Sequence, residues 1–208
     1  METDVLIVGG GPAGLAAAIA LRQRGLACTV VEARGLGIQM QGIDKACGEG
    51  LMPGAIDALS RLGIEVTPAD GHSFRGISFV SPRDRVAASF PEGMGIGVRR
   101  PRLHDMLRQR AEAVGATLRW ESRVQLSTPD TATMNGESIR FRWLVGADGH
   151  SSSVRRWAGL DRVRSVSLRY GFRRHLNVRP WSEFVEIYWG PRGQFYVTPV
   201  GFDCVGVV

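Results

Sequence analysis

The chain has 208 residues, of which 44% are hydrophobic and 22% charged, with a formal net charge of +6. This composition is typical of a globular protein large enough to bury a core, and it excludes disordered and fibrous classes. Lys45 is the only lysine, and the arginines are spread among acidic residues rather than clustered, which argues against a nucleic-acid partner.

The first element is an apolar run, Val5–Val8, that leads into glycines at positions 9, 11 and 14 and then into a helical pattern. Strand, tight turn and helix in this order form the context of a dinucleotide-binding fingerprint. Gly9 lets the chain turn off the strand, Gly11 lets the backbone approach a pyrophosphate, and Gly14 lets the helix pack close to the strand. The start of the helix offers unpaired N–H groups to phosphates.

A second apolar run, Cys28–Val31, ends in Glu32. A carboxylate at this strand end can accept hydrogen bonds from both hydroxyls of an adenosine ribose, and it would repel a 2′-phosphate. We therefore expect NAD or FAD here rather than NADP, with a structural turn that binds no nucleotide as the alternative.

The segment Ala33–Gly50 is rich in glycine, which indicates either a loop close to a ligand or a flexible surface loop. Helical patterns follow at Pro53–Leu62 and from Pro101 to Gly115. Between these helices we expect a small separate sheet, and after them further strands; the predicted strands are Ile77–Val80, Val86–Ser89, Ile96–Arg99, Thr117–Trp120 and Arg123–Leu126.

Asn135-Gly136 predicts a hairpin turn between Thr131–Met134 and Ser138–Phe141. A buried strand, Trp143–Val145, then runs into a turn, and a short helix begins within Ser151–Arg156. The rest of the pattern is typical of an antiparallel sheet, with strands at Ser165–Tyr170, Phe184–Trp189, Gln194–Thr198 and Asp203–Val208.

Three cysteines, Cys28, Cys47 and Cys204, are an odd number with no close spacing, which suits a reducing cytoplasm. The apolar stretch Val5–Leu21 follows acidic residues instead of the basic segment of a signal peptide, and no other run is long enough to span a membrane. We expect a cytoplasmic protein without an integral membrane segment.

Three features together make the chain similar to the flavoprotein monooxygenase family typified by p-hydroxybenzoate hydroxylase, and to its relatives the geranylgeranyl reductases. The first is the glycine turn with Glu32. The second is the run 146–155, which reads GADGHSSSVR and resembles the family pattern G-A-D-G-x-x-S-x-V-R. The third is Arg100 with Leu103 and Leu107, which resembles an R-x-x-L-x-x-x-L helix.

The resemblance implies a fold and a cofactor. The fold is α/β, with a Rossmann-like FAD-binding domain of the glutathione-reductase type over residues 1–70 and 96–160. An incomplete antiparallel substrate-domain sheet takes residues 71–95 and 161–208, because the pattern stops before a later Gly-Asp motif of the family; a fragment of a longer protein is expected. The residues implied in cofactor binding are Gly9, Gly11, Pro12, Ala13, Gly14, Glu32, Ala33, Arg34, Cys47, Gly48, Arg100, Val124, Asp148 and Gly149.

The resemblance also suggests roles for some of these residues. Arg100 would reach the FAD phosphates, with Arg99 or Arg102 as alternatives, because a guanidinium donates two parallel hydrogen bonds. Asp148 would contact the ribose and pyrophosphate region, and backbone groups of Val124 would recognise adenine. Cys47, in a segment similar to the reductase branch, would either donate a proton to substrate or line the pocket.

The activity implied is that of an FAD-dependent oxidoreductase. The principal hypothesis is an NAD(P)H-dependent monooxygenase that hydroxylates an aromatic or polyketide-like small molecule, with the cofactor supplying the chemistry. A flavin-dependent reductase of prenyl or other alkenes and an inactive FAD-binding module are the alternatives. No catalytic residue, metal site or oligomeric state is assigned. Aromatic residues are expected to wall an apolar substrate pocket: Phe172, Trp181, Phe184, Tyr188, Trp189, Phe195 and Tyr196.

Overall fold

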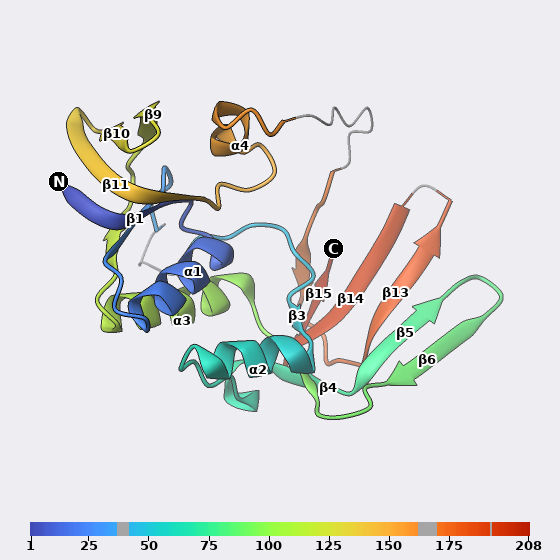
Figure 1. Ribbon diagram of the computed structural model, residues 1–208. Coiled ribbons are helices and arrows are strands. Elements are labelled where there is room, and N and C mark those ends of the chain that lie inside the picture. The colour runs from blue at the N-terminus through green and yellow to red at the C-terminus, as the bar shows by residue number, and fades with distance from the viewer. Residues whose placement is uncertain (37–41, 162–169, 192) are drawn as a thin grey trace. The chain divides into compact units, whose positions relative to one another are not determined.

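A computed structural model describes residues 1–36, 42–161, 170–191 and 193–208 of the chain (Figure 1). The chain divides into two compact units. Unit 1 comprises Met1–Ile43 and His104–Leu168, and unit 2 comprises Asp44–Leu103 and Arg169–Val208. Among the described residues, no helix is long and apolar enough to cross a membrane.

Unit 1 is built on a six-stranded sheet in the order β8-β2-β1-β11-β10-β9. Strands β8, β2, β1 and β11 run parallel, and β10 and β9 continue the sheet antiparallel (Figure 1). Their bounds are β1 (Glu2–Val8), β2 (Cys28–Val31), β8 (Thr117–Arg119), β9 (Val124–Thr128), β10 (Thr131–Met134) and β11 (Glu137–Gly146).

Apolar side chains cover both faces of β1. Helix α1 (Pro12–Arg22) packs against β1 and β2 through its buried residues Leu15 and Ile19. On the opposite face Leu6 belongs to a core cluster with side chains of β2, β10 and β11. Burial on both faces explains why β1 reads as a continuous apolar run. Helix α3 (Arg100–Ala113), from His104 onward, and the short α4 (Ser153–Trp157) complete the helices of unit 1.

The predicted strand, turn and helix at the N-terminus are confirmed, and so is the hairpin through Asn135-Gly136, whose φ angles of 49° and 86° are those of a tight hairpin turn. Two predictions for β11 are wrong. The strand is continuous from Glu137 to Gly146, and Trp143 is 66% exposed rather than buried. Trp143 lies next to Val5 of β1 in the sheet. Helix α1, however, packs mainly against β2 and β1, so it covers this part of β11 less and leaves Trp143 exposed.

Unit 2 contains a six-stranded sheet in the order β12-β15-β14-β13-β5-β6 and a three-stranded sheet in the order β3-β7-β4. The strands of the larger sheet are β5 (Gly76–Val80), β6 (Arg85–Ser89), β12 (Arg174–Leu176), β13 (Phe184–Gly190), β14 (Gly193–Gly201) and β15 (Cys204–Val207). The remaining elements are β3 (Gly50–Leu51), α2 (Pro53–Arg61), the 3-10 turn η2 (Pro68–Asp70), β4 (His72–Phe74) and β7 (Gly95–Gly97).

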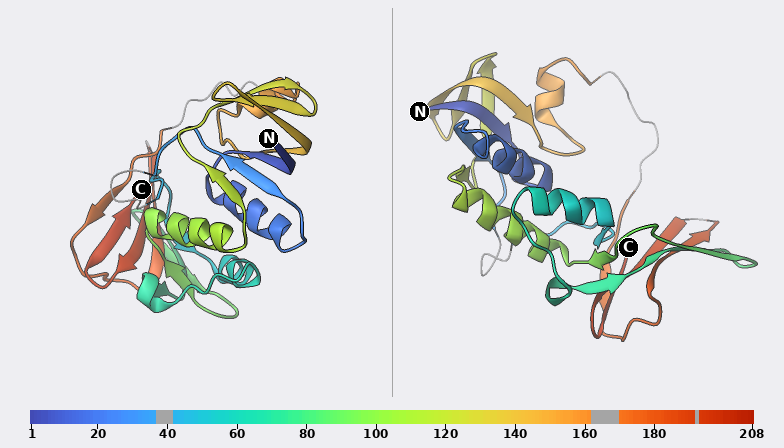
Figure 2. Two further views of the ribbon diagram at one scale, coloured as in Figure 1. Left: turned by 90° about the vertical axis from the view of Figure 1, so that its left-hand side faces the viewer. Right: turned by 60° about the horizontal axis from the view of Figure 1, so that its bottom comes forward.

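The sheet predicted from the C-terminal pattern is antiparallel from β12 to β13, as expected, but β13 pairs in parallel with β5. Figure 2 shows the hairpin of β5 and β6 beside β13. The hairpin of β5 and β6 is therefore not a separate small sheet. Strands β3, β4 and β12 were not predicted because runs of two or three residues carry no periodicity. The predicted strand Ser165–Tyr170 lies outside the described residues except for Tyr170, which is not in a strand.

Candidate functional site

The turn after β1 requires glycine at two positions. Gly9 has φ +113°, and a Cβ atom there would lie 2.3 Å from the Ala147 carbonyl oxygen. A Cβ atom on Gly14 would lie 1.9 Å from the Gly9 carbonyl oxygen, so the helix can approach the strand only without a side chain. At Gly11, by contrast, a Cβ atom would meet nothing within 4 Å, which leaves open space beside the turn. The turn is thus packed tightly on the protein side and open where a pyrophosphate would lie.

The start of α1 offers several hydrogen-bond donors. Among the described residues, none accepts a hydrogen bond from the backbone N–H of Gly11, Ala13 or Gly14. Pro12 at the first helical position has no N–H to satisfy, and the first turn carries no acidic residue. Unpaired N–H groups and the positive end of the helix dipole together form an anion site. These donors and the open space fit the pyrophosphate of a dinucleotide.

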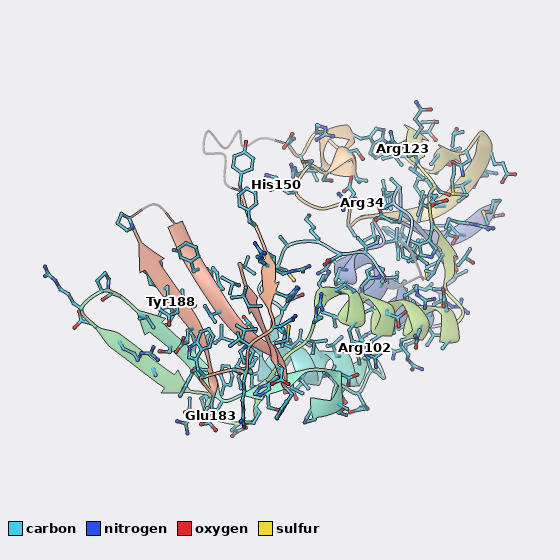
Figure 3. The ribbon with its side chains drawn as sticks, turned by 180° about the vertical axis from the view of Figure 1, so that it is seen from behind. Arg34, Arg102, Arg123, His150, Glu183 and Tyr188 are labelled. Atoms are coloured by element: carbon cyan, nitrogen blue, oxygen red, sulfur yellow. The ribbon has the colours of Figure 1, made fainter. Side chains whose placement is uncertain are left out.

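Glu32 follows β2 directly and braces the same turn. Its Oε2 accepts a hydrogen bond from the Gly10 N–H at 2.8 Å, and its Oε1 accepts one from the Arg34 N–H at 2.9 Å. Each carboxylate oxygen retains a further lone pair, so ribose hydroxyls can still donate to it. Ala33 and Arg34 are exposed, and Figure 3 labels Arg34 on the segment after β2.

Residues 121–122, just before Val124 in the chain, are hydrogen-bonded to the segment that contains Glu32. The Ser122 N–H donates to the Glu32 carbonyl oxygen at 2.9 Å, and the Glu121 N–H donates to the Arg34 carbonyl oxygen at 3.2 Å. Val124 itself begins the edge strand β9, and its side chain packs against the core cluster. Its role in adenine recognition remains a prediction.

Asp148 is held by the N-terminus of α4. Its carboxylate accepts hydrogen bonds from the Ser152 hydroxyl, from the Ser153 N–H at 2.6 Å and hydroxyl at 2.9 Å, and from the Val154 N–H at 3.2 Å. Burial alone would raise the pKa of Asp148, but these hydrogen bonds outweigh burial and lower it below its ordinary value. Gly149, with φ +82°, lets the chain turn between β11 and α4. Asp148 thus has a structural role, because it accepts from N–H groups at the start of α4, whose N-cap residue is Ser152, beside the nucleotide contact that the resemblance implies.

We expect the substitution Asp148→Asn to destabilise the protein by about 1 kcal/mol at neutral pH, because a neutral amide replaces the charged acceptor and hydrogen bonds to charged groups are about twice as strong as neutral ones. A carboxylate with a lowered folded-state pKa stabilises the fold above its unfolded pKa, and this contribution disappears as the pH falls through the lower folded value. The difference between wild type and variant should therefore be present at pH 7 and vanish in the acid range below pH ~4. Urea unfolding of both proteins across this pH range measures it; a difference that does not change with pH would contradict this role for Asp148.

In unit 2, the predicted residues Cys47, Gly48 and Arg100 line one cavity of about 340 Å³. The Arg100 Nε is buried and has no hydrogen-bond partner in the described part of the chain. A buried unsatisfied donor is costly, so this atom fits an acceptor supplied by a ligand. The remaining lining is mostly apolar and includes Leu51, Met52, Ile77, Val98, Leu103, Val185 and Ile187.

Of the seven aromatic residues expected to wall a substrate pocket, Tyr196 lines this cavity, and Trp181 and Phe184 line a smaller pocket, so the aromatic wall stays a prediction. Successive side chains of a strand point to opposite faces, so Val185 and Ile187 face the cavity while Phe184 and Tyr188 face away. Tyr188 (labelled in Figure 3) lies on the other face, where its hydroxyl donates to the buried Glu186 at 2.7 Å. This hydrogen bond to a carboxylate raises the pKa of Tyr188. Trp181 also donates to Glu186, at 3.0 Å. Phe172, Trp189 and Phe195 are more than half exposed.

Sequence reasoning missed a buried ionic cluster beside the cavity. The Glu49 side chain is 1% exposed, and its Oε1 accepts from Arg173 Nη1 at 3.0 Å and from the Arg100 N–H at 2.8 Å. Its Oε2 lies 2.6 Å from His175 Nε2. Arg173 in turn donates to Asp44 at 2.6 Å; burial would lower the pKa of this guanidinium, but Asp44 and Glu49 outweigh burial and raise it. The sequence carries no local signal for this cluster. Glu49 has a left-handed φ of 56°, but an unusual backbone angle at a glutamate is visible only in the structure.

The glycine turn, the unpaired donors and Glu32 on a parallel sheet define a Rossmann-like dinucleotide-binding protein. The chain belongs to the FAD binding domain family, whose sequence pattern matches residues 2–188. The predicted family resemblance, the fold class and FAD as the cofactor are therefore confirmed.

Named relatives include both kinds of enzyme considered from the sequence. The chain is 32% identical to the rifampicin monooxygenase of Rhodococcus hoagii, over 74% of the chain and 33% of that relative. It is 27% identical to digeranylgeranylglycerophospholipid reductase 3 of Methanosphaera stadtmanae, over 99% of the chain and 55% of that relative. The chain thus spans about half the length, or less, of these relatives.

Solved structures share the fold. A variant of 2-methyl-3-hydroxypyridine-5-carboxylic acid oxygenase superposes with a TM-score of 0.81 at 25% identity, over 100% of this chain and 58% of the other. PqsL of P. aeruginosa superposes with a TM-score of 0.80 at 22% identity, over 100% of this chain and 60% of the other, which is a likeness of fold alone.

Proposed function

We propose that the chain acts in an FAD- and NAD(P)H-dependent monooxygenase that hydroxylates an aromatic or polyketide-like small molecule. The observation that carries the proposal is the turn after β1, where the N–H groups of Gly11, Ala13 and Gly14 have no acceptor in the described part of the chain and a Cβ on Gly11 would meet nothing, in a chain of the FAD binding domain family. Similarity to the rifampicin monooxygenase and to aurachin C monooxygenase/isomerase of Stigmatella aurantiaca supports it.

In this proposal unit 1 binds the ADP half of FAD. The N–H groups of Gly11, Ala13 and Gly14 donate to the pyrophosphate, and Glu32 accepts from the ribose hydroxyls. In unit 2, Arg100 Nε, buried without a partner in the described part of the chain, would donate to an acceptor on a ligand in the cavity that it lines. When bound, FAD supplies the transfer of electrons from NAD(P)H to O₂.

Unit 2 provides the substrate pocket in the same proposal. The cavity of about 340 Å³ falls within the size range of small-molecule sites, and its apolar side chains favour an apolar substrate. By excluding water, these side chains would protect reactive groups from hydrolysis and orient the substrate. In this proposal the two units, Met1–Ile43 with His104–Leu168 and Asp44–Leu103 with Arg169–Val208, correspond to the cofactor part and the substrate part.

A second candidate is a flavin-dependent reductase of alkenes. Cys47 lines the cavity, and in this candidate its thiol would donate a proton to a substrate carbon. The likeness to the geranylgeranyl-type reductase of Methanosphaera stadtmanae favours this candidate.

Dependence on oxygen separates the two candidates. The protein is incubated with FAD and NADPH or NADH, with 2-naphthol as an aromatic probe and geranylgeraniol as an alkene probe. The monooxygenase proposal predicts that ¹⁸O from ¹⁸O₂ enters naphthol and that no product forms without O₂. Saturation of geranylgeraniol under strict anaerobiosis, with no oxygen incorporation in air, would contradict it and support the reductase.

A further inference from the structure

His104 is buried completely inside unit 1, although nothing in the fingerprint requires a histidine there. It lies on the apolar face of α3 with Leu107 and Ala111. Its Nε2 is 2.7 Å from the Gly10 carbonyl oxygen, and its Nδ1 is 3.2 Å from the Ile43 amide nitrogen. The ring is therefore joined by hydrogen bonds to the turn that faces the proposed pyrophosphate site.

These two partners fix the tautomer of the ring. A backbone N–H only donates, so Nδ1 must accept from Ile43 and carries no proton. A carbonyl oxygen only accepts, so Nε2 must carry the proton that it donates to Gly10. The two hydrogen bonds fit the tautomer with its proton on Nε2, because a proton on Nδ1 would leave no lone pair to accept the Ile43 N–H.

The bond to Gly10 determines the direction of the next N–H group. The Gly10 carbonyl and the Gly11 N–H belong to one planar trans peptide and point in opposite directions. Since His104 holds the carbonyl on the protein side, the Gly11 N–H points to the opposite side of this peptide. Gly11 lies beside open space, because a Cβ there would meet nothing within 4 Å. Rotation of this peptide would instead present a carbonyl oxygen to the phosphates.

Glycine at position 10 makes this bracing necessary. Glycine lacks a side chain that would restrict the peptide, so its orientation depends on external contacts. The Gly10 N–H is held by Glu32 at 2.8 Å, and a Cβ atom at Gly10 would lie 2.5 Å from the Trp120 ring, so a larger residue does not fit. Glu32 fixes one side of Gly10, and His104 fixes the other.

We propose that His104 is a positioning residue for FAD: by donating from Nε2 to the Gly10 carbonyl, it aims the Gly11 N–H at the pyrophosphate. The inference rests on the proposed role of this turn in binding FAD. It adds to that role a residue about ninety positions further along the chain, on a different element.

Two amide variants separate the two hydrogen bonds of the ring. In His104→Gln the side-chain amide nitrogen reaches the position of Nε2 and can still donate to Gly10. In His104→Asn the shorter amide reaches only the position of Nδ1, so it can accept from Ile43 but cannot reach Gly10. We expect His104→Gln to bind FAD within about threefold of wild type, and His104→Asn to bind at least about tenfold more weakly, as measured by flavin fluorescence.

Thermal melting of both variants without FAD shows the structural effect alone, and it should be similar for the two amides. A ¹⁵N spectrum of the wild-type imidazole should show the proton on Nε2. Equal FAD affinity of both variants and wild type, equal losses in both variants, or a proton on Nδ1 would overturn the role of His104. Absence of FAD binding by folded wild-type protein would overturn the proposed function itself, and the role of His104 with it.

Discussion

Replacement of Gly14 by alanine is expected to abolish FAD binding and to lower the free energy of unfolding by about 3 kcal/mol. The added Cβ would lie 1.9 Å from the Gly9 carbonyl oxygen, a backbone atom that cannot move without shifting the turn. Moving α1 away from β1 would also displace the N–H groups of Gly11 and Ala13 from the proposed pyrophosphate site. Urea unfolding and FAD titration of the variant measure the two effects.

Gly54→Ala is the matched control for this change. Gly54 lies in α2, and a Cβ atom there would meet nothing within 4 Å. Alanine should stabilise the protein by about 0.5–1 kcal/mol, because it favours the helix more than glycine does. If Gly14→Ala were as stable as the wild type and bound FAD as tightly, the close approach of α1 to β1 would not be needed for the fold or for FAD binding.

The second large effect is expected from Glu49→Gln in unit 2. The substitution keeps the size of the side chain but removes the charge that faces Arg173, whose side chain is 8% exposed. The new amide nitrogen would also place a donor against the donors of Arg173 or His175. Loss of one partner from a buried ion pair costs about 3–5 kcal/mol, and we expect a destabilisation near the lower end of this range.

Asp44→Asn tests whether burial determines this cost. Asp44 binds the same guanidinium at 2.6 Å, but its side chain is 50% exposed. Water therefore screens the Asp44 pair, and its loss should cost no more than about 1 kcal/mol. Chemical denaturation of the two variants compares these costs directly. Equal losses, or a larger loss for Asp44→Asn, would refute the central place of Glu49 in the cluster.

Much of unit 1 is predictable from sequence because its signals are local. The apolar run into Gly9 and the Asn135-Gly136 turn each lie within a few residues of the element that they define. The fingerprint also identifies Glu32, because the distance along the chain between a βα turn and the next strand end varies little in this fold.

The parts that sequence reasoning missed depend on contacts between distant segments. Arg173 meets Glu49 across more than a hundred residues, and β13 pairs with β5 across a similar separation. The direction of the aromatic side chains could not be predicted for a different reason: aromatic residues are frequent along the sheet, but the pleat and the buried Glu186 turn Tyr188 away from the cavity of unit 2. His104 was overlooked because a histidine on the apolar face of a helix resembles an ordinary core residue.

The most direct test of the account is an FAD titration of the folded 208-residue protein, followed by flavin fluorescence, beside Glu32→Ala and the control Glu137→Ala. Glu137 is an exposed carboxylate at the start of β11, away from the turn. The account predicts saturable binding that Glu32→Ala weakens by at least about tenfold, because a charged acceptor for the ribose and a brace for Gly10 are both lost, while Glu137→Ala leaves it unchanged. Absence of binding, or binding that is indifferent to Glu32, would contradict the assignment of the turn after β1 as the FAD site.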